Sequence, residues 1–520
     1  SANRHQRSMT FVRRMVQQAL RVSVRNAFPL VKWMERWAES AAAPPLGSAR
    51  QAVRTLDDMP GPTAASFAWD LFARGGLSRL HELQLEGVQR YGPVWKASFG
   101  PILTVHVADP ALIEQVLRQE GQHPMRSNLS SWKDYRKLRG HNFGLLTAEG
   151  EEWQEVRSLL GKHMLRPKAV EVYDDTLNSV VSDLISKLRF RRSSQGLVTD
   201  ITSEFYRFGL EGISSVLFES RIGCLDPVIP EETERFIESI NTMFVMTLLT
   251  MAMPSWLHQL YPKPWKTFCD CWDYMFEFAK GHIDQRLTAE ANKIAKGEKI
   301  EGRYLTYFLS QMGLPMKTIY SNVTELLLAG VDTISSTMSW TLYELSRHPE
   351  IQDALREEVL TVLEGRRIPD NTDVARMPLM KATVKEALSR LYPVIPANAR
   401  VISEKDIEVG GYLIPKNTLI TLCQFATSRD PAVFQNPDDF HPYRWFNKDE
   451  AHHPYASVPF GVGKRSCIGR RIAELELYLA LSRILMEFEV KPDPEGNSVK
   501  PMTRTLLVPE NAINLQFVER

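Results

Sequence analysis

The sequence contains little cysteine: there are five cysteines in 520 residues, an odd number scattered along the chain. Such a distribution does not form a disulfide framework, and it suits a reducing compartment. The two cysteines that lie close together, Cys269 and Cys271, lack the two-residue spacing of a zinc site and have no second pair nearby. A fold held together by disulfides or by zinc is therefore not expected.

The chain also lacks a charge excess, sequence repeats and marked linkers. Lysine and arginine number 63 against 62 acidic residues, so the formal net charge is +1 and there is no basic field to attract nucleic acid. No internal repeat or low-complexity segment follows residue 60, and nothing marks a domain boundary. With 43% hydrophobic residues overall, we expect residues 57–520 to form one large domain with a sizeable core.

Residues 1–56 differ in composition from the rest of the chain. They contain nine arginines and one lysine but only two acids, Glu35 and Glu39, and their apolar residues form amphipathic stretches. The run of about eighteen apolar residues that marks a membrane-spanning helix does not occur there, and neither does the pattern of a secretory leader. An arginine-rich, acid-poor, amphipathic segment is typical of a mitochondrial transit peptide, and a disordered basic tail is the alternative.

Apolar residues recur mostly with the spacing of helices, so we expect a mainly α protein with small β-sheets. The expected helices span 75–91, 147–165, 170–189, 203–219, 231–252, 265–295, 317–347, 350–364, 378–391 and 467–488. Short alternating runs predict strands at 101–109, in the series 399–423, and within 504–519.

The helix expected between Pro315 and Pro349 is the longest, and at 1.5 Å per residue it would reach roughly 50 Å. Its centre, AGVDTISST (329–337), is a weak helix former because it combines a glycine, an aspartate, β-branched residues and hydroxyl side chains. The hydroxyls can bond back to preceding carbonyls and loosen the helix locally. Alternatively, Gly330 allows the helix to pack closely on a neighbour.

One cysteine stands in a glycine-rich loop, FGVGKRSCIGRR (460–471), that leads into an apolar helix. A cysteine near a helix N-terminus meets unpaired amides and the positive end of the helix dipole, which favour the thiolate. Arg465, Arg470 and Arg471 would act in the same direction. The glycines permit turns and let the backbone approach a bulky group. Taken alone, a buried structural cysteine explains Cys467 as well as a ligand does.

The same loop resembles the haem-binding loop of the cytochrome P450 family, Phe-x-x-Gly-x-Arg-x-Cys-x-Gly. All the specified positions match, namely Phe460, Gly463, Arg465, Cys467 and Gly469. The resemblance implies the cytochrome P450 fold, with haem b between the long central helix and this loop. It also implies that the Cys467 thiolate is the iron ligand and that dioxygen is the co-substrate of a monooxygenase.

Two further segments resemble parts of that family's haem site. In AGVDT, the resemblance implies that Gly330 leaves room beside the iron and that Asp332 and Thr333 help to deliver protons to bound dioxygen. An acid and a hydroxyl can form such a relay where bulk water is excluded. The segment WQEVR resembles a helix that holds a haem propionate. The implied propionate partners are Trp153, through its indole N–H, and Arg157, Arg400 and Arg465, whose guanidinium groups suit carboxylates.

The segment FHPYRW supplies Arg444 of the charged core that the family has on the haem side. The family also has Glu-x-x-Arg, whereas here three residues separate Glu386 from Arg390, as if one residue had been added at or near Ser389. One added residue turns a helix by about 100°. We expect Arg390 to keep pairing with Glu386 and Arg444 and the helix end to be distorted. The alternative is a variant that does not load haem.

The leader is similar to those of the mitochondrial branch of the family, whose members are peripheral on the matrix side of the inner membrane. The resemblance implies a ferredoxin as electron donor, supplied in turn by a ferredoxin reductase. In that branch, basic residues on the helix carrying Glu386 meet the acidic ferredoxin. Lys381 and Lys385 match them, with Lys464 and Arg471 as possible additions. An ordinary solvated face is the alternative explanation.

Long stretches such as LLTAEGEEWQ (145–154) and TRTLLVPENAINLQF (503–517) resemble members that hydroxylate vitamin D. The resemblance implies hydroxylation of 25-hydroxyvitamin D, a lipophilic secosteroid, at carbon 1. Hydroxylation at carbon 24, hydroxylation of a sterol at carbon 27, and a non-catalytic haem-binding or ligand-binding variant are the alternatives. The apolar, methionine-rich stretch 245–265 suits an adaptable pocket and a membrane interface, or plain core packing. The implied pocket residues are Met251, Val331, Thr333, Val394, Ile395 and Thr505.

Overall fold

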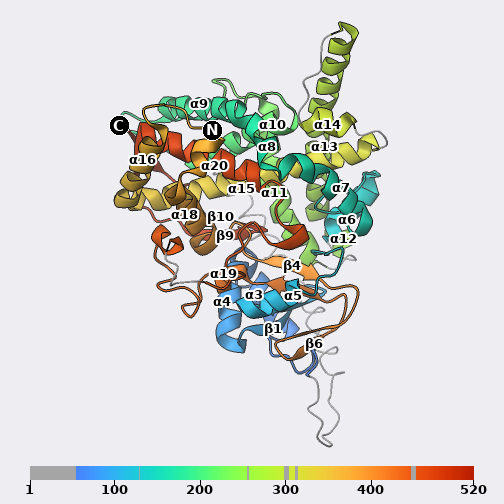
Figure 1. Ribbon diagram of the computed structural model, residues 1–520. Coiled ribbons are helices and arrows are strands. Elements are labelled where there is room, and N and C mark those ends of the chain that lie inside the picture. Colours follow the sequence, from blue (N-terminus) through green and yellow to red (C-terminus); the bar gives the residue numbers. More distant parts are fainter. Residues whose placement is uncertain (1–53, 128, 254–256, 298–303, 311–313, 447–451) are drawn as a thin grey trace, which may run out of the picture.

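Helices make up most of the molecule, and short strands form four separate small sheets (Figure 1). The structure is a computed structural model in which residues 54–127, 129–253, 257–297, 304–310, 314–446 and 452–520 are described. The expected mainly α architecture with small sheets is confirmed. The expected leader lies almost entirely outside the described residues, as does the middle of the apolar stretch 245–265.

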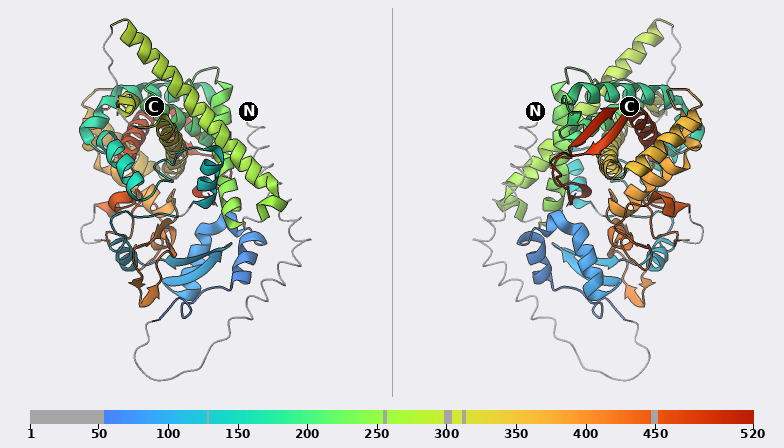
Figure 2. Two further views of the ribbon diagram at one scale, coloured as in Figure 1. Left: turned by 90° about the vertical axis from the view of Figure 1, so that its right-hand side faces the viewer. Right: turned by 90° about the vertical axis from the view of Figure 1, so that its left-hand side faces the viewer.

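The ten expected helices are all present, and all but α11 have shifted ends. They are α4 (Leu80–Tyr91), α7 (Gly150–Met164), α9 (Asp174–Arg191), α10 (Ile201–Leu217), α11 (Glu231–Ala252), α13 (Pro262–Ala295), α15 (Met316–Arg347), α16 (Pro349–Leu363), α18 (Pro378–Glu386) and α20 (Arg470–Glu487). Prolines account for several of the starts, because a proline in the first turn gives up no helical hydrogen bond. The longest helix is α13, with 34 residues, and not α15, with 32, as was expected from the sequence. The helix α13 crosses one face of the molecule and extends beyond its edge (Figure 2).

Shorter helices were not predicted, because they offer too few turns for a periodic pattern. They are α3 (Ala64–Phe72), α5 (Pro110–Leu117), α6 (Ser130–Arg139), α8 (Pro167–Val170), α12 (Leu257–Leu260), α14 (Tyr304–Ser310), α17 (Asn371–Ala375) and α19 (Gln424–Thr427). The start of α5 did carry a signal. The Asp109 carboxylate accepts a hydrogen bond from the Leu112 amide at 2.9 Å, and Pro110 follows it. The strand expected up to residue 109 therefore ends earlier.

Two of the sheets, β1-β2-β7-β4 and β5-β6, lie at one end of the molecule, low in Figure 1, whereas β9 and β10 lie nearer its centre. The largest has the order β1-β2-β7-β4, in which β2 and β7 run parallel with Val105 opposite Ile420. A second core of mainly Val, Ile and Leu side chains packs around this sheet. The strands are β1 (Val94–Phe99), β2 (Ile102–Val107), β3 (Leu197–Val198), β4 (Asn398–Val401), β5 (Ile407–Val409), β6 (Tyr412–Ile414), β7 (Leu419–Leu422), β8 (Phe488–Pro492), β9 (Pro501–Arg504), β10 (Leu506–Pro509) and β11 (Leu515–Glu519).

The central helix α15 runs without interruption through the weak segment 329–337. Its hydroxyls do bond back within the helix: Thr333 Oγ1 donates to the Ala329 carbonyl at 2.7 Å and Ser335 Oγ to the Val331 carbonyl at 2.9 Å. The loosening considered from the sequence is absent from this helix. Close packing is present instead, since a Cβ on Gly330 would lie 2.7 Å from a side-chain carbon of Ile213 in α10. Tertiary packing therefore outweighs weak propensity here.

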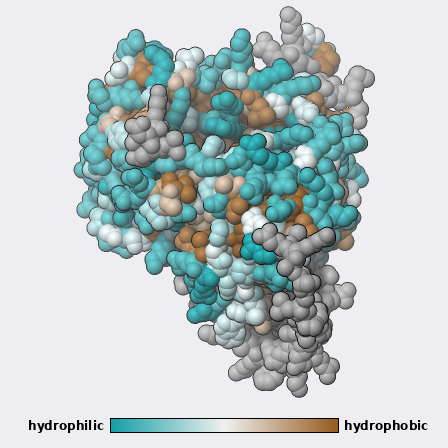
Figure 3. Space-filling model, turned by 60° about the horizontal axis from the view of Figure 1, so that its bottom comes forward, coloured by the Kyte–Doolittle hydropathy of each residue, from teal (hydrophilic) through white to brown (hydrophobic). Residues whose placement is uncertain are grey.

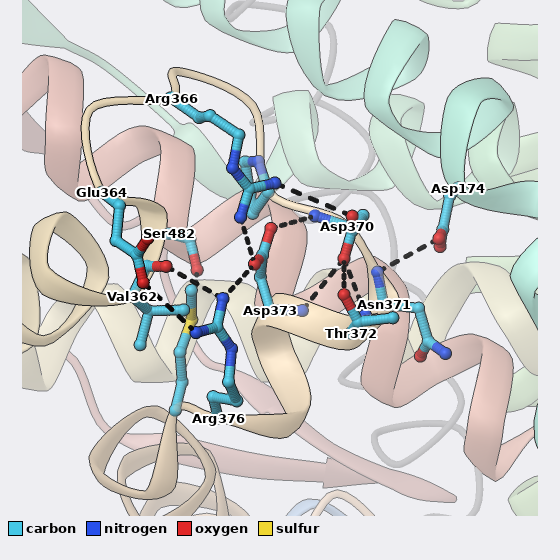
Figure 4. A network of polar contacts seen from close by, with 12 residues as sticks. Asp174, Val362, Glu364, Arg366, Asp370, Asn371, Thr372, Asp373, Arg376 and Ser482 are labelled. Carbon is cyan, nitrogen blue, oxygen red and sulfur yellow. Dashed lines mark hydrogen bonds and ion pairs between the residues drawn. The ribbon is translucent and has the colours of Figure 1, made fainter.

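A buried acid anchors the segment that leads into α18 (Figure 4). The Asp373 carboxylate accepts hydrogen bonds from Arg366 at 2.6 Å and Arg376 at 2.9 Å, and its side chain has no exposed surface. Asp370 completes a capping box with Asp373 at the start of α17. The Asn371 amide donates to Asp174 at the start of α9. These contacts fix α17 and therefore the start of α18.

Candidate functional site

Backbone hydrogen bonds and left-handed glycines shape the loop that carries Cys467. The Cys467 amide donates to the Phe460 carbonyl at 2.7 Å, and the 3-10 turn η5 (Gly463–Arg465) lies between them. Gly461 and Gly463 have φ values of +68° and +70°, a region that side chains disfavour. The loop thus presents Cys467, which is half-buried, just before the start of α20.

Two glycines of this loop differ in what surrounds them. A Cβ on Gly463 would come within 2.8 Å of Glu120 Oε1. Gly469 has φ −84°, which any residue adopts, and a Cβ there would meet no described atom within 4 Å. Neither strain nor contact with the protein explains a glycine at position 469. Its open side would let a flat group approach the backbone.

Four arginines lie close together near the cysteine, and few acidic side chains balance their charge. They are Arg126, Arg157, Arg400 and Arg465. Burial lowers the pKa of Arg126 to about 10 and the pKa of Arg465 to about 9, and repulsion from neighbouring arginines adds to both effects. Burial also lowers the pKa of Arg157. Arg400 has an ion pair, with Glu120 at 2.7 Å. Such a cluster suits a ligand that carries carboxylates.

Arg465 braces the loop rather than pointing at open space. Its guanidinium donates to the carbonyls of Pro124, Leu145 and Ala148 at 2.6–3.4 Å and stacks 3.9 Å from the centre of the Trp153 ring. In turn, Arg126 donates to the Arg465 carbonyl at 2.7 Å. Arg126 was missed in the sequence, because it stands in an irregular segment and only the fold brings it to the loop.

The environment of the Cys467 thiol differs from the sequence-based expectation. Burial raises the pKa of this thiol, while the Gly469 amide, Arg126, Arg157 and Arg470 act against burial. Arg471 is exposed and lies 3.6 Å from Glu474. The protein alone therefore favours the neutral thiol, and a bound metal would be needed to hold the thiolate.

The predicted acid and hydroxyl of α15 do not bond to each other. Thr333 Oγ1 donates to the Ala329 carbonyl within the helix. Asp332 is fully buried and forms an ion pair with Arg504 of β9, while the Tyr206 hydroxyl of α10 donates to Asp332 Oδ1 at 2.5 Å. Sequence reasoning missed Tyr206 and Arg504, which lie far from Asp332 in the chain.

Around Glu386, the wider spacing is accommodated by a π-helical turn, η3 (Ala387–Leu391), that continues α18. The Tyr392 amide donates to the Ala387 carbonyl at 2.9 Å, one residue further back than in an α-helix. This is the distortion expected from the sequence, in a defined form. Arg390 Nε lies 3.9 Å from Glu386 Oε1, at the limit of an ion pair.

Arg444, rather than Arg390, is the main partner of Glu386. Arg444 Nε donates to Glu386 Oε1 at 3.0 Å, and the Trp445 indole donates to Oε2 at 2.8 Å. Arg390 instead donates to the carbonyls of Ser428 and Pro437. The buried carboxylate is therefore paired and hydrogen-bonded despite the added residue.

The decisive comparison is with protein families: the model described as "Cytochrome P450" matches residues 59–517. The chain belongs to the cytochrome P450 family. It is 53% identical to the human "25-hydroxyvitamin D-1 alpha hydroxylase, mitochondrial", over 95% of this chain and 98% of the relative. The rat protein of that name is 54% identical over 90% and 95%. The rat "Sterol 26-hydroxylase, mitochondrial" is 42% identical over 93% and 92%.

The residues of the Cys467 loop fit the haem of a cytochrome P450. One protein thiol is present for the iron, the side of Gly469 is open to a flat ring, and the arginine cluster is short of the carboxylates that two propionates provide. Arg126, Arg157 and Arg400 would hold the propionates, with Arg465 and Trp153 supporting the loop between them.

The predicted ferredoxin-binding lysines border a hollow of about 510 Å³ next to this cytochrome P450 loop. Lys381, Lys385, Arg470, Arg471 and Phe460 all line it. The Lys381 ammonium donates to the Ala375 carbonyl at 2.7 Å, and the Lys385 ammonium lies 3.7 Å from the centre of the Trp445 ring. The two lysines are therefore held in place, and basic groups outnumber the acid Glu474 around the hollow.

The predicted substrate residues come from several elements. The Leu507 amide donates to the Val394 carbonyl at 2.9 Å, and Thr505 Oγ1 donates to the Phe244 carbonyl of α11 at 3.0 Å. Met251 is half-buried in the last turn of α11, Val331 is buried in α15, and Ile395 follows the π turn. The structure thus links the β9–β10 turn to α11 and to the chain after α18.

Proposed function

We propose that the protein is a haem-thiolate monooxygenase that hydroxylates 25-hydroxyvitamin D at carbon 1 to give 1,25-dihydroxyvitamin D. The observation that carries this proposal is the identity of 53–54%, over at least 90% of the chain, to proteins named for that activity. In the overall reaction, a C–H bond becomes a C–OH bond. One atom of dioxygen enters the product, and the other leaves as water with two protons and two electrons.

In this proposal, haem b supplies the activation of dioxygen when it is bound, and the protein supplies its ligand and surroundings. Cys467 provides the thiolate, and Arg126, Arg157 and Arg400 neutralise the propionates. Asp332 and Thr333 would move protons towards the oxygen site. The apolar side chains Met251, Val331, Val394 and Ile395 exclude water and bind the secosteroid, and Thr505 offers it a polar group.

A ferredoxin is the proposed electron donor, reduced in turn by a ferredoxin reductase. The basic rim of the 510 Å³ hollow supports this, because the cations Lys381, Lys385, Arg470 and Arg471 are complementary to an acidic partner. The loop that carries Cys467 borders the same hollow through Phe460 and Gly461. An electron delivered there would have a short path to the thiolate ligand.

We further propose a position on the matrix side of the inner mitochondrial membrane, with residues 1–56 as transit peptide. The named relatives are mitochondrial proteins. No described helix is long and apolar enough to cross a membrane. Apolar patches interrupt the hydrophilic face shown in Figure 3. Exposed apolar side chains available for peripheral contact are Trp69, Leu103, Leu260 and Tyr261.

The alternatives have less support. The sterol hydroxylases share only 42% identity with the chain. A non-catalytic variant was considered because of the Glu386–Arg390 spacing, yet Glu386 keeps its hydrogen bonds with Arg444 and Trp445. Both alternatives are outcomes of the following experiment.

The test is product analysis after reconstitution of the haem-loaded full chain with a mitochondrial ferredoxin and its reductase. We expect 25-hydroxyvitamin D to be converted to the 1-hydroxylated product and a cholesterol-derived sterol to be a much poorer substrate. Preferential conversion of the sterol would contradict the proposed substrate. Hydroxylation of the secosteroid on its side chain would contradict the proposed position of hydroxylation. No turnover of either compound by a haem-loaded protein would support the non-catalytic variant.

A further inference from the structure

Asp332 is held in a buried polar cluster that joins four elements of the fold. Arg504 of β9 forms an ion pair with Asp332 Oδ1 and donates to the Tyr206 hydroxyl of α10 at 2.5 Å. Tyr206 donates in turn to the same carboxylate oxygen at 2.5 Å. The second nitrogen of the guanidinium fork donates to Asn241 Oδ1 of α11. Two donors therefore converge on one oxygen of Asp332.

The other carboxylate oxygen of Asp332, Oδ2, has no hydrogen-bond partner among the described residues. Asp332 Oδ2 is buried and accepts no hydrogen bond from any described residue, although the side chain has no exposed surface. A carboxylate oxygen that is buried and unpaired is costly unless it has a further role. The cluster thus holds the carboxylate by Oδ1 and leaves Oδ2 available to a water molecule or a proton.

The turn that follows Arg504, between β9 and β10, contains a strained residue. Thr505 has φ +76°, a rare conformation for a β-branched side chain, and its hydroxyl donates to the Phe244 carbonyl of α11. This turn and the contact with Asn241 fix the direction of the Arg504 side chain from both ends. The strain is consistent with a function for this position rather than with a plain hairpin.

We propose that Arg504 and Tyr206 are positioning residues for Asp332. Arg504 holds Asp332 Oδ1 by an ion pair, and Tyr206 fixes the carboxylate rotamer so that the unpaired Oδ2 can take up a proton and release it towards the Thr333 hydroxyl. No bond other than those to the transferred proton changes. This inference rests on the proposed function, in which two protons are consumed for each water molecule released.

The test compares Tyr206→Phe with wild type in the haem-loaded full chain. We expect haem content and the spectral shift on binding 25-hydroxyvitamin D to be unchanged. The fraction of electrons that ends in hydroxylated product should fall about tenfold, the effect of losing one hydrogen bond to a charged group, and the solvent deuterium isotope effect should increase. Tyr304→Phe is the matched control, because this buried hydroxyl has no hydrogen-bond partner among the described residues.

A double-mutant cycle with Asp332→Asn then separates positioning from independent effects. If Tyr206 acts through Asp332, adding Tyr206→Phe to Asp332→Asn should lower product yield no further. Normal yield and isotope effect in Tyr206→Phe would overturn the inference while leaving the proposed function intact. A wild-type protein without turnover would overturn the proposed function first. If Tyr206→Phe does not fold, Arg504→Lys, which keeps the charge but loses the guanidinium fork, carries the same comparison.

Discussion

At the scale of single residues, Gly463 and Gly469 lie in one loop but differ in backbone conformation and in the space around them. Gly463 has φ +70° and stands against Glu120, so the protein itself requires a glycine there. Gly469 has an ordinary φ and open space beside it. The family motif specifies both positions, but only the structure shows that the glycine at 463 is required by backbone conformation and packing and that the glycine at 469 is not.

We predict opposite effects of alanine at these two glycines. Gly463→Ala should lower the free energy of unfolding by about 1–2 kcal/mol, because a side chain is forced into the left-handed region. Gly469→Ala should leave folding of the haem-free protein unchanged but reduce haem retention. Denaturant unfolding of the haem-free protein and haem titration measure the two effects. Equal loss of stability in both variants would contradict this assignment.

The sequence identified the residues that lie in contiguous motifs, such as Cys467 and Glu386. It did not identify Arg126, Tyr206 or Arg504. Each of these three meets its partner through contacts between segments distant in the chain, and none stands in a local pattern that indicates such a contact. The environment of Cys467 was also misjudged, because burial, which raises its pKa, depends on packing that a sequence pattern does not contain.

At the scale of elements, the helix α18 shows how an added residue is absorbed. The π turn at Ala387–Leu391 takes up the extra residue while Glu386 keeps Arg444 as a partner. Single π turns of this kind are typical of insertions tolerated within a helix near functional sites. The π turn weakens the contact between Glu386 and Arg390, whose Oε1 and Nε atoms lie 3.9 Å apart.

Deleting Ser389 should restore an α-helical turn and the short Glu386–Arg390 hydrogen bond. We expect the free energy of unfolding to rise by about 1 kcal/mol, the usual net value of one hydrogen bond, with haem content equal or higher. Ser389→Ala is the control, since it keeps the helix length and removes a buried hydroxyl that has no described partner. Loss of haem from the deletion variant, with Ser389→Ala unaffected, would show that the rest of the core is adapted to the π turn.

The anchor at Asp373 gives a pH-dependent prediction. Burial alone would raise the pKa of Asp373, but hydrogen bonds from Arg366, Asp370 and Arg376 outweigh it and hold the pKa below 3.8. A carboxyl whose pKa is lowered by folding stabilises the protein above its unfolded pKa, and that stability is lost as the pH falls through the folded pKa. The contribution is therefore complete at neutral pH.

Asp373→Asn should lower the free energy of unfolding by about 2 kcal/mol at pH 7. The difference from wild type should persist at pH 5 and shrink below about pH 4. Urea unfolding at a series of pH values measures it. Asp134→Asn, at an exposed position of α6, is the control and should change stability little at any pH. A difference between wild type and Asp373→Asn that grows on acidification would contradict the ion-pair account.

Long periodic segments made the helices predictable, and α11 begins and ends at the expected residues. The short helices and the strands β1, β3 and β8 were missed, because few residues cannot establish a period. For the centre of α15 the sequence left two alternatives, loosening by hydroxyls or close packing at Gly330, and the structure shows the close packing. The hydroxyls of this segment are satisfied within the helix and its surface is buried against α10, so packing decides the outcome there.

At the scale of the whole molecule, a net charge of +1 conceals a local basic surface. Basic side chains from α18 and α20 line the same hollow beside the Cys467 loop. Because the two helices are far apart in the sequence, the sequence alone does not show that these side chains are neighbours. Charges at such a rim act mainly on association with a charged partner and are screened by salt.

Lys381→Glu should raise the KM for ferredoxin about tenfold at low ionic strength, with smaller effects as salt increases, and should leave the spectral titration with substrate unchanged. The measurement is turnover as a function of ferredoxin concentration. Lys416→Glu, an exposed lysine outside the residues that line the hollow, is the matched control. Equal changes in KM for the two variants would contradict the proposal that ferredoxin docks at the hollow.

The central claim is that Cys467 is the thiolate ligand of a haem held by this fold. The most direct measurement is the absorbance difference spectrum of the reduced, carbon monoxide-bound full chain, with Cys467→Ala and Cys269→Ala beside it. We predict a Soret band at the position of a thiolate-ligated haem in wild type and in Cys269→Ala, and its absence in Cys467→Ala. A band at the position of a neutral-ligand haem in wild type, or no bound haem, would contradict the account.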